Sequence, residues 1–151
     1  MRKAILFLFL AVPAFTGCAS LTIRAVDYSW SFESVFTADS SGYVRAEPKT
    51  IAFDARELFR AETNDPAGAA GAVVRMIRDS DGYYFITSAG FKHVYIFTWS
   101  RAELSLKKRV LIAEQGMTKP YFNRRPLGIE LVANGQTYLL NRKGIIPGDK
   151  K

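Results

Sequence analysis

The chain has 151 residues and a net charge of +7, with 48% hydrophobic and 23% charged residues. This length suits one domain that can bury a core without disulfide staples. One cysteine and one histidine exclude a disulfide within the chain and a metal site built from several histidines.

The N-terminus carries a short positive start and then an apolar segment. Arg2 and Lys3 precede residues 4–15, AILFLFLAVPAF, which carry no charge. This run has the length of the apolar region of a signal peptide and falls short of the roughly 20 residues that a helix needs to span a bilayer. Gly17 stands directly before Cys18, and a small residue there fits the cleavage pocket of a signal peptidase.

Residues 1–18 together resemble the signal of bacterial lipoproteins. The resemblance implies that residues 1–17 are removed and that the thiol of Cys18 and the new amine are acylated. Several acyl chains anchor a protein stably, whereas one chain binds only marginally. Ala19 and Ser20 follow without an Asp, which in Gram-negative lipoproteins implies an outer-membrane destination facing the periplasm. The alternatives are an ordinary secretory signal or a buried cysteine.

The mature part, residues 18–151, is expected to be a single domain with a loose tail from Pro147 to Lys151. Its first segment, residues 21–36, alternates apolar and polar side chains, which predicts a long half-buried strand. Residues 38–42 form a turn cluster. Residues 43–54 are extended again, with Pro48 indicating an edge strand or a break. The apolar face of the first strand comprises Val26, Tyr28, Trp30 and Phe32.

The next two segments predict a helix and a loop. Residues 55–62, ARELFRAE, fit a short helix capped by Asp54 or a continued strand, and we favour the helix. Residues 63–71, TNDPAGAAG, have the composition of a loop.

Strand signals are sharper in the second half of the chain. The turn at 79–82, ending in Gly82, predicts a hairpin of residues 72–78 and 83–88. Further strands are expected at 93–100 and 103–114. In the latter, Leu104, Leu106, Val110 and Ile112 share one face with Lys108, so that strand must bulge or be exposed at that end.

Asn134-Gly135 is a strong hairpin signal between residues 127–133 and 136–142. Short strands joined by tight turns predict an all-β domain with one short helix, built as an antiparallel β-sandwich or a small barrel.

Few residues suggest catalysis or metal binding. His93 is the only histidine, and no Gly-x-Ser-x-Gly motif accompanies it, so we expect it at the surface or hydrogen-bonded. Asp79 and Asp81 resemble the start of a calcium loop, but Tyr83 to Ile86 continue as a strand, which favours a plain turn. No motif selects a pair of carboxylates. We therefore expect no catalytic residues, no metal and no cofactor.

Two groups of residues are candidates for contact with a partner. The strand HVYIFTW places His93, Tyr95, Phe97 and Trp99 on one face, either as part of the core, which we favour, or as a platform on which Tyr95 and Trp99 stack against sugar rings.

The second group, Tyr121, Phe122, Arg124 and Arg125, lies in an expected loop from Lys119 to Pro126 that two prolines stiffen. Such a loop could hold an acidic or glycan surface. The alternative is that its aromatic rings pack under the sheet while the arginines are solvated. A second basic cluster, Lys107–Arg109, has the same two interpretations: contact with an anionic partner, or a solvated face.

Two stretches of the mature chain resemble concanavalin-like jelly-roll domains. They are GAVVRMIRDSDGYYFITSAGF and the later NRRPLGIELVANGQTYLLNRKG, which share a pattern of strands and polar turns with the second half of that fold. The resemblance implies a β-sandwich and assigns no carbohydrate-binding residue.

Two functions are therefore expected from the sequence. The first is a lipid-anchored, non-enzymatic envelope protein that contacts a protein, cell-wall or glycan partner, and the second is a carbohydrate-binding jelly-roll module. Outside the cytoplasm, nucleic acid is not an expected partner. Exposure of the aromatic face at residues 93–99 would distinguish the two functions.

Overall fold

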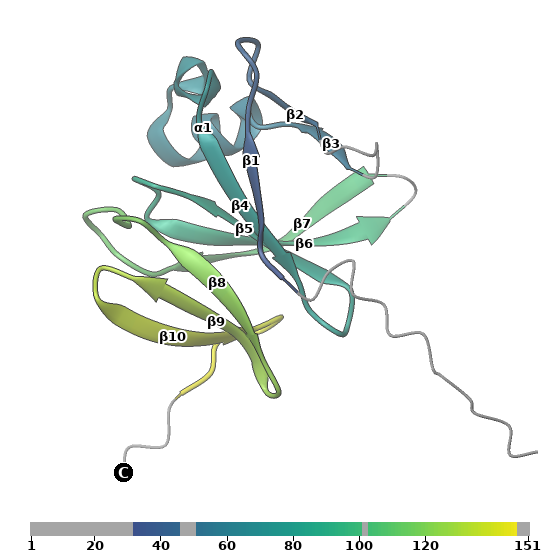
Figure 1. The fold of residues 1–151 in the computed structure, drawn as a ribbon, viewed down its shortest axis with the longest axis vertical. Helices are drawn as coiled ribbons and strands as arrows, with labels where there is room; N and C mark the ends of the chain where they lie inside the picture. Colours follow the sequence, from purple (N-terminus) through teal and green to yellow (C-terminus); the bar gives the residue numbers. More distant parts are fainter. Residues whose placement is uncertain (1–31, 46–50, 101–102, 148–151) are drawn as a thin grey trace, which may run out of the picture.

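The computed structural model describes residues 32–45, 51–100 and 103–147 (Figure 1). Cys18, most of the strand expected at 21–36, Pro48 and the tail after Pro147 lie outside these residues. The described chain is an all-β domain with one α-helix, as the strand patterns predict. Its strands form antiparallel sheets, which is the arrangement that short strands joined by tight turns favour.

The larger sheet has five strands in the order β1-β4-β5-β6-β7. All four neighbouring pairs are antiparallel. Consecutive hairpins join β4 to β7, so the sheet follows the order of the chain from β4 onward. Its strands are β1 (Ser34–Thr37), β4 (Val73–Arg78), β5 (Tyr83–Ser88), β6 (His93–Ser100) and β7 (Glu103–Leu111).

The smaller sheet has four strands in the order β11-β10-β9-β8. These are β8 (Tyr121–Arg125), β9 (Gly128–Ala133), β10 (Gln136–Asn141) and β11 (Gly144–Ile145). Asn134 and Gly135, both with positive φ, make the tight turn between β9 and β10 that the Asn-Gly pair predicts.

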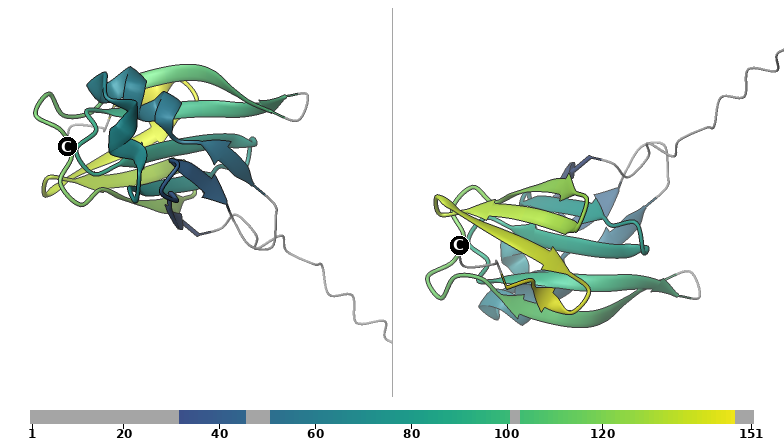
Figure 2. Two further views of the ribbon diagram at one scale, coloured as in Figure 1. Left: turned by 90° about the horizontal axis from the view of Figure 1, so that it is seen from above. Right: turned by 90° about the horizontal axis from the view of Figure 1, so that it is seen from below.

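The smaller sheet packs on one face of the larger sheet, and a helical layer covers the opposite face (Figure 2). It comprises α1 (Arg56–Thr63), the 3-10 turn η1 (Pro66–Ala69), and a separate hairpin of β2 (Tyr43–Arg45) with β3 (Ala52–Asp54). Figure 2 shows this layer on one side of the five-stranded sheet and the four-stranded sheet on the other. The middle sheet is therefore covered on both faces.

The central strand shows the effect of this double cover. All residues of β5 from Tyr84 to Ser88 are buried, on both faces of the strand. On the side of the helix, the ring centroid of Phe59 in α1 lies 4.8 Å from the ring centroid of Phe91. The Phe91 centroid in turn lies 6.0 Å from the ring centroid of Tyr95. Toward the small sheet, the buried side chains include Val94, Ile96, Val110, Ile129, Leu131 and Leu140.

Several expected elements are confirmed with small changes of boundary. The helix at 55–62 forms as α1, but its N-cap residue is Ala55 and not the expected Asp54. The Asp54 carboxylate, one residue earlier, accepts a hydrogen bond from the Arg56 amide at 2.9 Å. The extended segment 43–54 is divided into β2 and β3, which pair with each other. The strand expected at 103–114 ends at Leu111, and an irregularity places Leu106 opposite Phe97 and Lys108 opposite Ile96. This bulge turns Lys108 to the face opposite that of Leu106, which resolves the conflict in the sequence pattern.

Two expectations are wrong. The segment from Lys119 to Pro126 is not a loop, because Tyr121–Arg125 pair with β9 as strand β8. Phe32, expected on a buried face, is 74% exposed because regular pairing of β1 begins only at Ser34.

Candidate functional site

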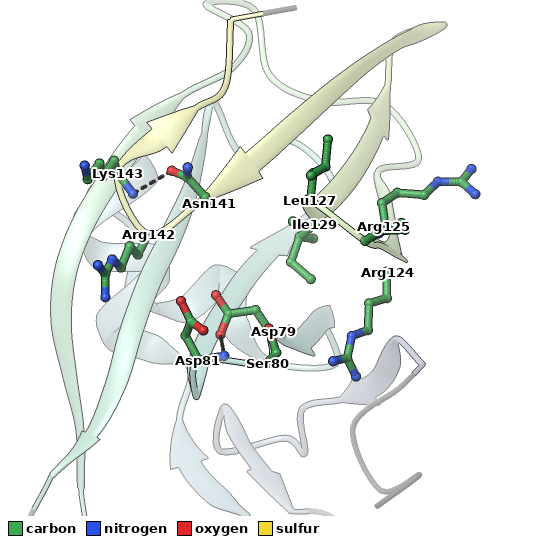
Figure 3. Close-up of a pocket in the computed structure, with 12 residues that line it drawn as sticks. Asp79, Ser80, Asp81, Arg124, Arg125, Leu127, Ile129, Asn141, Arg142 and Lys143 are labelled. Atoms are coloured by element: carbon green, nitrogen blue, oxygen red, sulfur yellow. Dashed lines mark hydrogen bonds between the residues drawn. The ribbon is translucent and has the colours of Figure 1, made fainter. Parts of the chain in front are cut away.

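Three turns enclose a polar hollow at one end of the sandwich (Figure 3). They are the β4–β5 turn with Asp79 to Asp81, the β8–β9 turn with residues 124–129, and the β10–β11 turn with residues 141–143. The hollow has a volume of about 490 Å³. Asp79 and Lys143, 64 positions apart in sequence, therefore lie at one site, because both sheets place these turns at the same end.

Arg124 points into this hollow from the inner face of the small sheet. On β8 it shares a face with Phe122, and both pair across from the buried residues Ile129 and Leu131 of β9. Alternation along a strand therefore directs the Arg124 side chain toward the space between the sheets. Figure 3 shows its guanidinium directed toward the β4–β5 turn. Within the described part of the chain, no acidic side chain forms an ion pair with it.

Arg125 points the other way and is occupied. Its Nη2 and Nε donate to the Glu130 carboxylate at 2.7 and 3.0 Å, and Asn123 donates to the same group at 3.0 Å. The Arg125 and Asn123 hydrogen bonds lower the pKa of Glu130. Arg125 thus fixes the outer face of the β8–β9 hairpin and leaves Arg124 as the available arginine of the pair.

The acidic wall of the hollow is a tight turn. One carboxylate oxygen of Asp79 accepts the amides of Asp81 at 2.9 Å and Tyr83 at 2.8 Å, while Gly82 takes a φ of +88°. Burial raises the pKa of Asp79, although these amide hydrogen bonds oppose the effect. Asp81 is exposed, and Figure 3 shows both carboxylates between Arg142 on one side and Arg124 on the other.

The third wall is basic. The Arg142 guanidinium lies 6.0 Å from the centre of the Tyr83 ring, a cation–π distance, and both Arg142 and Lys143 are exposed. The Lys143 amide donates to the Asn141 side chain at 2.8 Å, which holds the β10–β11 turn. The hollow therefore presents opposite charges on facing walls, and no ion pair between described residues closes it.

The other candidate residues are distributed between the core and the surface. Phe122 is 2% exposed and Tyr95 1%, so neither ring is open to a glycan. Tyr121 is 42% and Trp99 49% exposed, but they lie on different sheets, on β8 and β6. Of the residues proposed from sequence, Arg124 and Arg125 therefore both lie at the hollow, but only the Arg124 side chain is directed into it (Figure 3). Cys18 lies outside the described residues.

Sequence reasoning missed Arg142, Lys143 and the acidic turn as parts of the same site. Each occurs in a recognisable turn, but their proximity depends on how the two sheets pack. One sequence signal could have indicated this site. Had residues 121–125 been predicted as a strand, Arg124 would have stood out as a basic residue on the inward face of that strand.

A second polar cluster joins the helix to the large sheet. The side chain of Glu62 on α1 is 1% exposed. It accepts hydrogen bonds from the Tyr95 hydroxyl at 2.6 Å and the Lys92 amide, and lies 3.0 Å from Nδ1 of His93. The expectation that His93 is hydrogen-bonded is confirmed. Burial and the neighbouring Glu62 raise the pKa of Tyr95.

Two further observations concern the described residues alone. Among them, no group of three or more His, Cys, Asp or Glu side chains is placed to hold a metal ion. No helix within the described ranges has the length and apolar character to cross a membrane.

Comparison of the chain with protein-family models, curated proteins and solved structures finds no match.

Proposed function

We propose that this protein is a lipid-anchored bacterial envelope protein whose β-sandwich binds a partner without catalysing a reaction. The N-terminal sequence supports the anchor: a positive start, an uncharged segment of signal-peptide length, and Gly17 before Cys18. Acylation of Cys18 would hold the domain at a membrane surface. The residues that follow the cysteine favour the outer membrane, with the domain facing the periplasm.

The hollow around Arg124 supports binding. The single observation that carries this part of the proposal is that Arg124 is directed into the hollow without an ion-pair partner among the described residues. Arg124 is exposed, so water solvates its charge without a carboxylate partner and its guanidinium is open to a ligand. Arg124 has no such partner among the described residues. It is therefore available to an anionic group of an envelope component, such as a phosphate or a carboxylate.

The residues lining the hollow also favour binding over turnover. They include carboxylates, guanidinium groups, an ammonium group and Ser80, but no histidine or cysteine. A serine nucleophile needs a base within hydrogen-bond reach, and Oδ1 of the neighbouring Asp79 already accepts hydrogen bonds from two backbone amides.

A carbohydrate-binding jelly-roll module is the alternative function. It draws support from Trp99, which is half exposed near an apolar hollow of about 340 Å³ that includes Phe97, Leu104 and Leu106. Burial of Tyr95 shortens any stacking platform on this face to little more than one ring. Loss of polysaccharide binding in Trp99→Ala, with Arg124→Ala unaffected, would favour this alternative.

The proposal is tested by affinity capture from envelope extracts with the detergent-solubilised full chain. Arg124→Ala should lose a partner that the wild type captures at low salt and retains less at moderate salt. Arg125→Ala is the matched control, since its side chain points away from the hollow and pairs with Glu130. Equal capture by all three proteins would exclude the hollow as the binding site, provided that their far-UV circular dichroism spectra agree.

A further inference from the structure

The charges around the hollow indicate the class of ligand more closely than the presence of an arginine does. Setting aside Arg125, which pairs with Glu130, the hollow is lined by the cations Arg124, Arg142 and Lys143 and by the anions Asp79 and Asp81. In Figure 3 the carboxylates lie between the cations rather than apart from them. A ligand with negative charge alone would gain from the arginines but be repelled by the aspartates.

The facing charges do not neutralise each other directly. None of the five cation–carboxylate contacts in the described structure joins Asp79 or Asp81 to Arg124, Arg142 or Lys143. Asp79 is committed to the backbone of its turn, whereas no hydrogen bond is formed by the Asp81 carboxylate within the described residues. Asp81 and Arg124 thus each have unused hydrogen-bonding capacity and both line the hollow.

We propose that the hollow binds a zwitterionic phosphate ester with a primary ammonium group, of the phosphoethanolamine type. The phosphate would accept hydrogen bonds from Arg124, and the ammonium group would donate to Asp81. This inference rests on the proposed binding role of the hollow and adds the requirement for a positive group on the ligand.

Size and charge agree with this ligand class. A hollow of about 490 Å³ is within the range of small-molecule sites and exceeds what a bare phosphate fills. The three cations outnumber the two carboxylates by one, so the hollow suits a phosphate ester with one ammonium group, which is neutral as a diester and slightly negative as a monoester. A phosphate can accept two parallel hydrogen bonds from one guanidinium group, whereas an ammonium group can pair with a single carboxylate.

The test uses isothermal titration of the full chain in detergent micelles with three probes: O-phosphoethanolamine, its N-acetyl derivative and ethanolamine. The wild type should bind the first, bind the second at least about fivefold more weakly, and bind ethanolamine least, since each lost charge-assisted hydrogen bond weakens binding. Arg124→Ala should weaken binding of O-phosphoethanolamine about tenfold or more. Arg125→Ala should change it by less than about twofold.

Asp81→Asn separates this inference from the broader proposal. It should remove the preference for O-phosphoethanolamine over the N-acetyl derivative, while folding is unaffected because the Asp81 side chain does not form the turn. If the wild type binds both esters equally and Asp81→Asn changes nothing, the zwitterion inference is wrong but an Arg124-dependent anion site stands. If no probe binds to the wild type, the inference is also wrong, and the affinity capture described above still tests the binding role.

A final arm distinguishes the sources of the same chemistry. Phosphatidylethanolamine added to the micelles should compete with soluble O-phosphoethanolamine if the ligand is a lipid headgroup. If phosphatidylethanolamine does not compete while O-phosphoethanolamine still binds, the ligand would be an ester carried by a soluble or glycan component.

Discussion

Arg124 and Arg125 show how one position along a strand decides the environment of a charged side chain. Arg125 lies on the outer face of β8 and is held by Glu130, with N–O distances of 2.7 and 3.0 Å. Arg124 is exposed but lies on the inner face, which it shares with the buried Phe122, and it pairs across from the buried Ile129. The two residues have the same chemistry, so only the pairing of β8 with β9 distinguishes them.

Glu33 is a second residue whose role depends on the space between the sheets. Its carboxylate accepts hydrogen bonds from Arg75 of β4 at 2.6 Å and from the Phe122 amide of β8 at 2.9 Å. It therefore joins the two sheets along one side of the sandwich. Burial raises the pKa of Glu33 above its ordinary value of 4.5, against the opposing effects of the Phe122 amide and Arg75.

The raised pKa predicts the direction of a pH effect. Above about pH 4.5 the folded protein retains the Glu33 proton more strongly than the unfolded chain, so the contribution of this group to stability falls as pH rises toward its folded pKa. In urea denaturation from pH 4 to 7, the free energy of unfolding of the wild type should fall relative to that of Glu33→Gln, which cannot titrate. A difference that instead grows in favour of the wild type with rising pH would contradict this account.

At the scale of elements, Glu62 fixes α1 to the large sheet. Replacing Glu62 by Ala would leave the Tyr95 hydroxyl, the Lys92 amide and His93 without their shared partner. Because unpaired buried donors are costly, Glu62→Ala should lower the free energy of unfolding by about 3 kcal/mol. Urea denaturation measures this loss.

Glu57→Ala provides the matched control on the same helix. Glu57 pairs with Arg60 in an exposed i,i+3 ion pair, so its loss should cost no more than about 0.5 kcal/mol. Similar losses for the two variants would show that Glu62 does not anchor the helix.

Gly128, the first residue of β9, has a backbone that approaches β10 closely. A Cβ atom at this position would lie 2.3 Å from the Leu140 carbonyl oxygen, and φ is +156°. Gly128→Ala should therefore destabilise the protein by about 3 kcal/mol as the backbones separate. Gly135→Ala meets no atom within 4 Å and retains only the strain of positive φ, about 1 kcal/mol. Thermal unfolding that ranks Gly135→Ala as the more harmful change would be inconsistent with this packing.

These elements also show which parts of the fold local sequence determines. The β4–β5 and β9–β10 hairpins could be predicted because Gly82 and Asn134-Gly135 supply the turn conformations that the strands need. Strand β8 could not, because the flanking Pro120 and Pro126 and the adjacent Arg124 and Arg125 have the composition of a loop, and its extended conformation comes from pairing with β9. Without strand β8, the orientation of the Arg124 side chain could not be predicted. The site could not be predicted either, because it forms where two sheets pack together and no local sequence pattern specifies that packing.

At the scale of the whole molecule, the proposed anchor and the proposed site belong to separate parts of the chain. Cys18 precedes the first described residue, Phe32, by 14 positions, which can span at most about 50 Å when fully extended. A sandwich held this way would stay close to the membrane surface while its terminal hollow remained open to solutes or headgroups. The positive net charge of the chain is compatible with an anionic surface nearby.

Acylation of Cys18 is the most direct test of the central claim that this is an anchored envelope protein. Intact-mass analysis of the purified wild type should show a chain that begins at Cys18 with added acyl groups, and membrane fractionation should recover it in the envelope. Cys18→Ser has no thiol for lipid transfer and should be either uncleaved or soluble and unlipidated. A wild-type mass without acyl groups, or a Cys18→Ser variant that is still processed and lipidated, would contradict the account.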